Sequence, residues 1–170
     1  MTTAKVCARL PPPSAPEMAL ALFLHVISAV VWVGGMFFAV AALRPASAHL
    51  PPAERMTVWE GTLARFFRWA LLALVLLLLT GFAMIGKFYG SMAATPLHIH
   101  LMMGLGILMM LLFGHVFFAP FRRLRLAVAA VDPDSALRNL NQIRVFVTIN
   151  LFLGIATIFV ATAGRFGVFA

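Results

Sequence analysis

The sequence has 170 residues, of which 63% are hydrophobic and only 11% are charged, and its mean hydropathy is +1.02. Soluble globular domains contain about 45–50% apolar and about 25% charged residues. The length allows one domain, and no soluble domain of that size can hide such an apolar excess inside. The composition therefore predicts an all-α integral membrane protein whose apolar surface faces lipid.

Basic side chains give a formal net charge of +8, a balance that also occurs in nucleic-acid-binding proteins. Here these side chains lie in the short connections between apolar runs, and no polar segment carries a basic stripe with interleaved aromatic residues. That placement is typical of membrane topology signals. We therefore expect the lipid bilayer, and not nucleic acid, as the partner.

Residues 1–17 are rich in proline and predict an irregular tail. Residues 18–164 predict a single transmembrane domain, a four-helix bundle with up-down topology. Each predicted span is long enough to cross about 30 Å of hydrocarbon at about 1.5 Å per residue. The spans are 18–43, 66–86, 97–119 and 143–163.

Proline residues mark the ends of these spans. The first span is expected to stop at Arg44-Pro45, and the third to begin after Thr95-Pro96 and to close at Pro120. Asp132-Pro133 predicts the start of a helix that continues into the fourth span. Two interpretations of segment 52–66 remain: an amphipathic helix lying in the membrane interface, or a direct extension of the second span.

The distribution of lysine and arginine predicts the orientation. The first and third connections carry nine of these residues, whereas the second connection and the two tails carry four. Because basic connections stay on the cytoplasmic side, both termini are expected on the outer, periplasmic side of a bacterial cytoplasmic (inner) membrane.

The predicted spans contain no acidic residue but do contain histidines, and ionisable groups at membrane depth are functional candidates. His25 lies in the first span. Its helical face carries small residues, which favour close helix packing, together with Trp32. We expect this face to point into the bundle and Trp32 to help line a cofactor site.

The third span contains His98, His100 and His115. His100 shares a helical face with Gly104 and Gly114, whereas His98 lies about 200° away around the helix and in its first turn. Helical phase therefore predicts that His100 is the inward-facing residue of the first two.

Because the first and third helices both start outside, His25 and His100 are expected at similar depth. Two neutral imidazoles from facing helices are the ligand set of a bis-histidine haem b. The same histidines could instead bind a copper ion, with Met103 or Met102 as a thioether ligand. Both cofactors stay open at this point.

A second site near the inner leaflet is a further hypothesis, built on His115 with His49 or with Arg44, which could also hold haem propionates. The alternative is that the histidines only tie helices together. The fourth span offers partners for that role in a stripe of polar and small residues: Asn150, Gly154, Thr157, Ala161 and Gly164.

The stretch His25-x6-Trp32-x-Gly34-Gly35-Met36-Phe37-Phe38, ending at Arg44-Pro45, resembles the first helix of the copper resistance D family. In the third span the resemblance continues with His98-Ile99-His100, then Gly114-His115, Pro120 and Arg123. This family is related to the haem-containing protoporphyrinogen oxidases of bacterial membranes.

The resemblance implies a four-helix unit that handles haem or copper, with His25 as the first-helix ligand and the His98/His100 pair supplying the third-helix ligand. It favours His98, whereas helical phase favours His100. The oxidases of this related group show a His-Leu/Val-Lys pattern at the start of the third helix. In this sequence His100 stands where that pattern has lysine, which argues against oxidase activity.

Three functions follow from these observations. The first is a haem- or copper-binding membrane protein that acts in electron transfer with a redox partner protein, or in copper handling. The second is a haem-dependent porphyrinogen oxidase, and the third is a non-enzymatic scaffold or accessory subunit. No nucleophile, acid–base pair or phosphate-binding loop indicates an enzyme, and the sequence leaves a homo-oligomer open.

Overall fold

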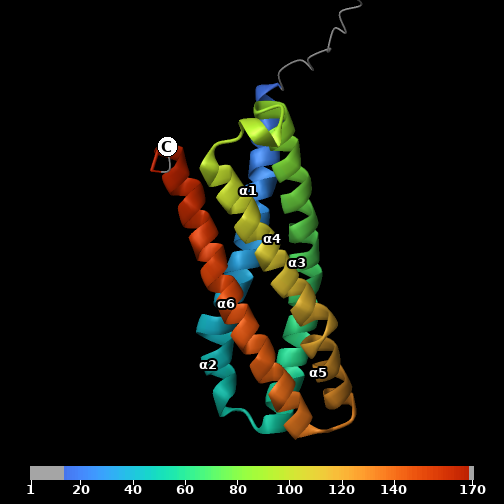
Figure 1. Ribbon diagram of the computed structural model, residues 1–170. Coiled ribbons are helices and arrows are strands. Elements are labelled where there is room, and N and C mark those ends of the chain that lie inside the picture. Colours follow the sequence, from blue (N-terminus) through green and yellow to red (C-terminus); the bar gives the residue numbers. More distant parts are fainter. Residues whose placement is uncertain (1–13, 169–170) are drawn as a thin grey trace, which may run out of the picture.

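The computed structural model describes residues 14–168, which fold into long helices running up and down and contain no strand (Figure 1). Four helical segments are long and apolar enough to cross a membrane, which confirms the predicted all-α membrane fold. The elements in chain order are α1 (Ala15–Phe38), η1 (Ala39–Leu43), α2 (Arg44–Ala46), η2 (Ser47–His49), α3 (Pro52–Phe88), η3 (Met92–Ala94), α4 (Leu97–Phe118), α5 (Pro120–Ala129) and α6 (Pro133–Arg165).

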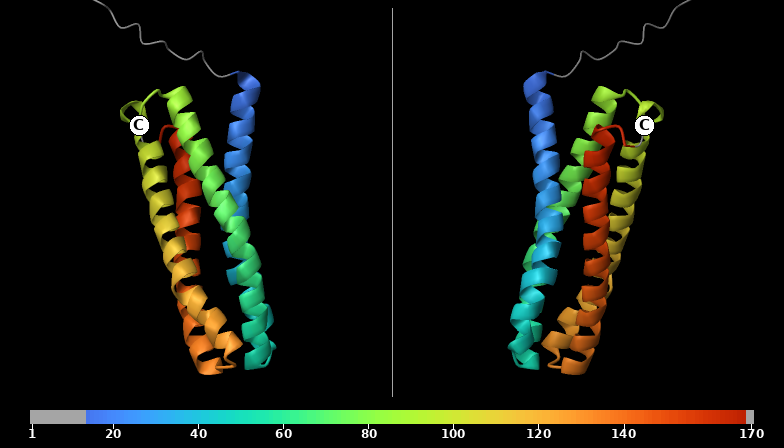
Figure 2. Two further views of the ribbon diagram at one scale, coloured as in Figure 1. Left: turned by 90° about the vertical axis from the view of Figure 1, so that its right-hand side faces the viewer. Right: turned by 90° about the vertical axis from the view of Figure 1, so that its left-hand side faces the viewer.

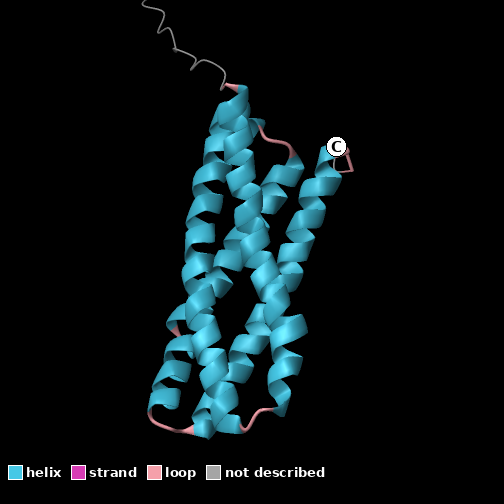
Figure 3. Cartoon of the chain, turned by 180° about the vertical axis from the view of Figure 1, so that it is seen from behind, coloured by secondary structure: helices cyan, strands magenta, loops and turns pink. Residues whose placement is uncertain are grey.

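Short loops join the helices at both ends of the bundle (Figure 3). We call the end at which α1 begins and α6 ends the terminal end. The opposite end, which holds α2, α5 and the first turns of α3 and α6, is the arginine-rich end (Figure 1). Most of the predicted tail, residues 1–13, lies outside the described residues. Helix α1 begins at Ala15, three residues before the predicted span, because Pro16 fits the first turn of a helix.

Helix α1 does not stop at Arg44-Pro45, as the sequence had predicted. It passes through the π-helical turn η1, in which the N–H of Arg44 donates to the carbonyl of Ala39, and continues as α2. Proline lacks an N–H and its ring clashes with the carbonyl four residues earlier. The wider π turn accommodates that clash, so the proline redirects the helix rather than ending it.

Helix α3 runs unbroken from Pro52 to Phe88. Segment 52–66 is therefore the direct extension of the second span and not a separate interfacial helix. Its residues Met56, Trp59 and Leu63 are buried within the protein, because α5 and α6 cover this face.

Helix α4 ends at Phe118, so the third span closes just before Pro120, as the sequence predicts. The backbone turns at Ala119 (φ −110°, ψ −83°), and Pro120 then occupies the first turn of the new helix α5. The N–H that proline lacks would be unpaired in a first turn anyway. One face of α5 is buried through Phe121 and Leu124, so a basic segment that the sequence analysis treated as a loop belongs to the packed bundle.

Helix α6 begins where the sequence predicted. The Asp132 carboxylate accepts a hydrogen bond of 3.0 Å from the backbone N–H of Ser135, which caps the helix. This hydrogen bonding lowers the pKa of Asp132 below its usual value. The helix then continues without interruption to Arg165.

The helices form two pairs. Helix α1 packs mainly on α3, and α4 packs mainly on α6. The order around the bundle sets α1 and α4 diagonally opposite each other (Figure 1). Helix α1 separates from α4 and α6 toward the terminal end, while α3 leans toward them (Figure 2), and α1 and α4 come close to each other along almost none of their length.

The core that joins the two pairs lies in the middle of the bundle and in its arginine-rich half. At its centre Phe67 is 2% exposed, and its ring meets those of Phe113 and Phe121 edge-on at 5.4 Å and 4.7 Å between centroids. Edge-to-face contacts of this kind add about 0.5–1.5 kcal/mol each to the area that is buried. Between the level of Ser28 and the terminal end of the bundle, Thr80 and Thr95 are the only buried residues among 14–168.

Helix α1 packs tightly on α3 at Gly35, where a Cβ atom would overlap with the ring of Phe66. The neighbouring Gly34 has no atom within 4 Å of the equivalent position. We expect Gly35→Ala to lower the free energy of unfolding by about 1–3 kcal/mol relative to Gly34→Ala, which is the usual cost of overpacking. Both changes bring the same gain in helix propensity, so the comparison isolates packing.

The measurement is the unfolding of both variants in detergent or lipid. Equal stability of Gly35→Ala and Gly34→Ala would contradict the close packing of α1 on α3.

Candidate functional site

His25 lies on the face of α1 that meets α3. Its Nδ1 atom is 2.9 Å from the hydroxyl oxygen of Thr80, and its Cε1 atom is 3.4 Å from the position where Gly81 would carry a Cβ atom. Thr80 is buried and His25 is partly buried. The glycine next to Thr80 thus leaves room for the imidazole between the two helices.

The hydroxyl of Thr80 fixes the tautomer of His25. That hydroxyl donates its hydrogen to the carbonyl of Leu76, one turn earlier on α3. Its oxygen can therefore only accept from Nδ1 of His25, so Nδ1 carries the proton and Nε2 keeps a free lone pair. Metal-binding histidines have this arrangement, in which an outer partner orients the ring through the nitrogen that does not bind.

His98 lies in the first turn of α4 and is partly buried against α6. A Cβ atom at Gly164 would lie 2.3 Å from its Cγ atom and 2.4 Å from its Cβ atom. Only glycine allows α4 and α6 to approach this closely at that level. Gly164 therefore sets the position of His98.

The structure reverses the assignment that helical phase gave to His98 and His100. His100 is exposed, and its Nδ1 atom lies 3.2 Å from the Thr95 hydroxyl and 3.3 Å from the Pro96 carbonyl. These partners belong to the turn before α4, so the ring folds back toward that turn. The phase argument failed because apolar residues surround α4 on all sides, and the packing on Gly164 decides which face points inward.

His25 and His98 lie at similar heights on diagonally opposite helices. Val33, Met109 and Gly154 meet in one layer of the bundle. Along the helix axes, His25 lies about 12 Å and His98 about 16 Å from this layer toward the terminal end, at about 1.5 Å per residue. His25 and Thr80 thus belong to one helix pair, and His98 and Gly164 to the other.

The proposed second site does not come together in the described residues. His115 is exposed, and its ring packs 5.0 Å from that of Phe146 between centroids. His49 and Arg44 are exposed at the arginine-rich end, and no hydrogen bond or ion pair joins either side chain to His115 within residues 14–168. A shared ligand role of His115 with His49 or Arg44 stays a prediction.

Met102 and Met103 are partly buried on α4, and no contact of residues 14–168 ties either sulfur to a histidine. Within the same residues no three His, Cys, Asp or Glu side chains converge as a metal ion would need. Haem iron needs only two protein ligands, a number that His25 and His98 can supply.

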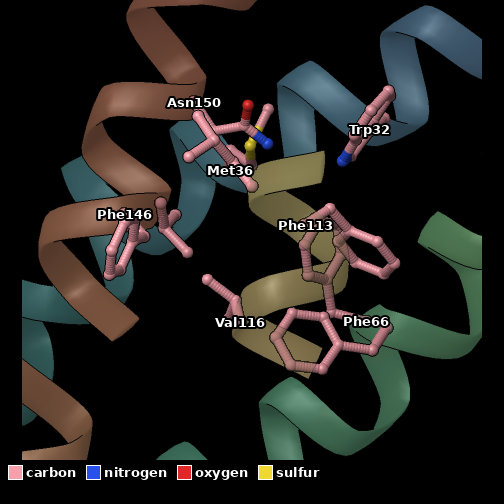
Figure 4. A pocket seen from close by; sticks show the side chains of 10 residues that line it. Trp32, Met36, Phe66, Phe113, Val116, Phe146 and Asn150 are labelled. Atoms are coloured by element: carbon pink, nitrogen blue, oxygen red, sulfur yellow. The ribbon is translucent and has the colours of Figure 1, made fainter. Parts of the chain in front are cut away.

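Trp32 is buried about two helical turns after His25 on α1. Its ring lies edge-on to that of Phe113, with 6.1 Å between the ring centroids. It lines a cavity in the centre of the bundle together with Asn150 of α6 (Figure 4). Both side chains are at least 96% buried, and neither the ring nitrogen of Trp32 nor the Oδ1 atom of Asn150 has a hydrogen-bond partner. One donor and one acceptor thus face a small apolar space.

The cavity is small, about 10 Å³, and has room for about one water molecule. A macrocycle such as haem cannot fit there. Trp32 can therefore bound a site between His25 and His98 on its inner side. The small cavity that Trp32 lines with Asn150 is a different space.

Comparison with known proteins bears on the part of the chain that contains α3 to α6. The family model of copper resistance protein D matches residues 60–163, which is more than half of the sequence. The chain belongs to the copper resistance protein D family. No curated protein and no solved structure matches it.

The matched residues of this family member include Thr80 and His98 but not α1. The family match therefore does not test the resemblance that was based on His25 and Trp32. Sequence analysis missed Thr80 as the partner of His25. The available signal was a single hydroxyl in an otherwise apolar run, Leu76-Leu77-Leu78-Leu79-Thr80.

We expect His25 in the cofactor-free protein to carry its proton on Nδ1 at mildly alkaline pH, where the ring is neutral. Nitrogen-15 spectra of histidine-labelled protein report the tautomer, and His25→Gln identifies the signal. In Thr80→Val the acceptor is lost and the two tautomers should mix, whereas Thr57→Val, which removes a hydroxyl bonded only to Ala53 on the same helix, should change nothing. An Nε2-protonated His25 in the unaltered protein would contradict the geometry.

Proposed function

We propose that this chain is a membrane haem protein of the copper resistance D family in which His25 and His98 bind the iron of haem b from opposite sides. The observation that carries the proposal is the hydrogen bond from His25 to Thr80, because it leaves Nε2 of His25 as a free ligand atom. The second support is His98, which lies at similar height on the diagonally opposite helix.

The chemistry of the surrounding residues fits this cofactor. Haem b is a flat apolar macrocycle, and the inner faces of α1, α3, α4 and α6 between the histidines and Trp32 are almost entirely apolar. Helix α1 separates from α4 and α6 toward this end of the bundle (Figure 2). Glycines at positions 81 and 164 let the two imidazoles lie directly against α3 and α6.

Bound haem would supply one-electron chemistry. The chain contributes the two imidazoles, the hydroxyl of Thr80 that orients one of them, and an apolar surrounding that excludes water. His25 and His98 would both serve as protein ligands of the haem iron, which would favour electron transfer over reaction of a substrate at the iron. The function that follows is electron transfer within the bacterial cytoplasmic membrane, with a redox partner protein, rather than porphyrinogen oxidation.

The test is the absorption spectrum of the purified protein, with haem and metal content measured on the same sample. We expect the Soret band and sharp α and β bands of a reduced bis-histidine haem. His25→Ala and His98→Ala should each lose the cofactor, whereas His100→Ala and His115→Ala should keep it. A colourless protein with stoichiometric copper would instead support copper handling, and a protein with neither would support a scaffold with structural histidines.

A packing variant separates ligand loss from general misfolding. Gly164→Ala should displace His98 and weaken haem binding by about 10–100-fold, the usual effect of disturbing a group that holds a ligand. Gly114→Ala on α4 is the matched control, since nothing lies within 4 Å of the added methyl group. Full haem binding by both His98→Ala and Gly164→Ala would exclude His98 as a ligand.

A further inference from the structure

Three arginines from three separate helical segments come together at the arginine-rich end. Arg144 lies on α6, with its guanidinium 4.7 Å from the centre of the Trp59 ring of α3. The same ring lies one turn after Arg55 of α3 and is hydrogen-bonded to Ser47, which follows Arg44 of α2 by three residues. We call Arg44, Arg55 and Arg144 the arginine cluster.

Contacts between the segments hold the cluster in place. The ring nitrogen of Trp59 donates a buried hydrogen bond of 2.9 Å to the hydroxyl of Ser47. Arg55 lies one turn before Trp59, and Arg44 lies three residues before Ser47, so each shares a helical face with its neighbour in this contact. Trp59 of α3 thus contacts η2, which directly follows α2, and the guanidinium of Arg144 on α6.

The cluster has no negative partner within residues 14–168. All five acidic residues of the chain are described: Glu17 pairs with Lys87, Glu60 pairs with Arg125, and Asp132 caps α6, while Glu54 and Asp134 are exposed and form no ion pair. The Nε atoms of both Arg55 and Arg144 are buried and have no hydrogen-bond acceptor. Buried charged donors without acceptors are costly, and this cost points to an anionic ligand with several acceptor oxygens.

The position of the cluster indicates the source of that anion. Arg44 directly follows the apolar run that ends at Leu43, and Arg144 directly precedes the apolar run that begins at Val145. Both therefore lie where a membrane span meets the headgroup layer, and basic pockets between helices at this level bind anionic headgroups.

We propose that Arg44, Arg55 and Arg144 form a binding site for the phosphate group of an anionic phospholipid. The planar guanidinium groups provide paired N–H donors that match phosphate oxygens. Scattered topology signals need no such convergence, because the positive-inside effect depends only on which connection carries the charge. The inference is independent of the proposed haem site, which lies toward the other end of the bundle.

The experiment follows the thermal unfolding midpoint of the full chain in detergent during titration with short-chain phosphatidylglycerol. Parallel titrations use phosphatidylcholine of the same chain length and inorganic phosphate. We expect phosphatidylglycerol to raise the midpoint and the other two to leave it unchanged. An equal effect of phosphatidylcholine would overturn the anionic site, and an equal effect of inorganic phosphate would overturn the assignment to lipid.

Variants locate the binding. Arg55→Gln and Arg144→Gln should each require about tenfold more phosphatidylglycerol for the same shift, as expected for the loss of one charged hydrogen-bond donor group. Arg123→Gln, an exposed arginine of α5 at the same end, is the control and should behave as the unaltered protein does. Arg55→Gln leaves the contact of Arg144 with Trp59 intact, so it serves if Arg144→Gln does not fold. Equal responses in all variants would overturn the proposal.

Discussion

The packing around Phe67 is the interaction on which the rest of the bundle depends. This ring contacts aromatic side chains of α4 and α5 and so joins the pair α1–α3 to the pair α4–α6. Toward the arginine-rich end the joint continues through α5 and α6, which cover the lower part of α3. Toward the terminal end nothing comparable holds the pairs together. Within residues 14–168 the bundle is therefore most firmly packed in its middle and at the arginine-rich end.

Polar groups in this chain follow the demands of a lipid solvent. Hydroxyls within the spans, such as those of Ser28, Thr157 and Thr162, donate to a backbone carbonyl one turn earlier, which satisfies them without a tertiary partner. Thr80 does the same, but its remaining lone pair faces His25. The arginine cluster and the pair of Trp32 and Asn150 leave polar atoms unpaired. These exceptions carry the functional interpretation, since unpaired buried polar groups are expensive to maintain.

The sequence predicted the number of spans and most of their ends, because length and hydropathy measure directly what a bilayer requires. It correctly ended a helix before Pro120, but it failed at Pro45, where a π turn carries the helix past the proline. It also missed the new helix α5 that begins at Pro120. Sequence rules state that a proline removes a backbone hydrogen bond. They do not state which packing contacts with neighbouring helices stabilise the chain on either side of it. The packing of α5 on α6 supplies the reason for a helix after Pro120.

The candidate site was predictable only in part. His25 and the third-span histidines stand out as ionisable groups among apolar residues. The choice between His98 and His100 depended on helix rotation, which an almost uniformly apolar α4 does not encode. Family resemblance favoured His98, and the close approach at Gly164 places this residue against α6. The pairing of His25 with Thr80, and the meeting of Arg44, Arg55 and Arg144, depend on contacts between helices distant in sequence, so neither could be predicted from the sequence.

A distance measurement between α1 and α4 tests the central claim that one cofactor joins the two helix pairs through His25 and His98. Spin labels on the exposed positions of Leu20→Cys and Leu101→Cys, in a Cys7→Ser background, report the separation of these helices at the terminal end by pulsed electron resonance. The account predicts that added haem narrows the distribution of distances between the two labels. In the same labelled protein with His98→Ala, added haem should leave that distribution unchanged. A distribution that stays the same while haem binds stoichiometrically would contradict it.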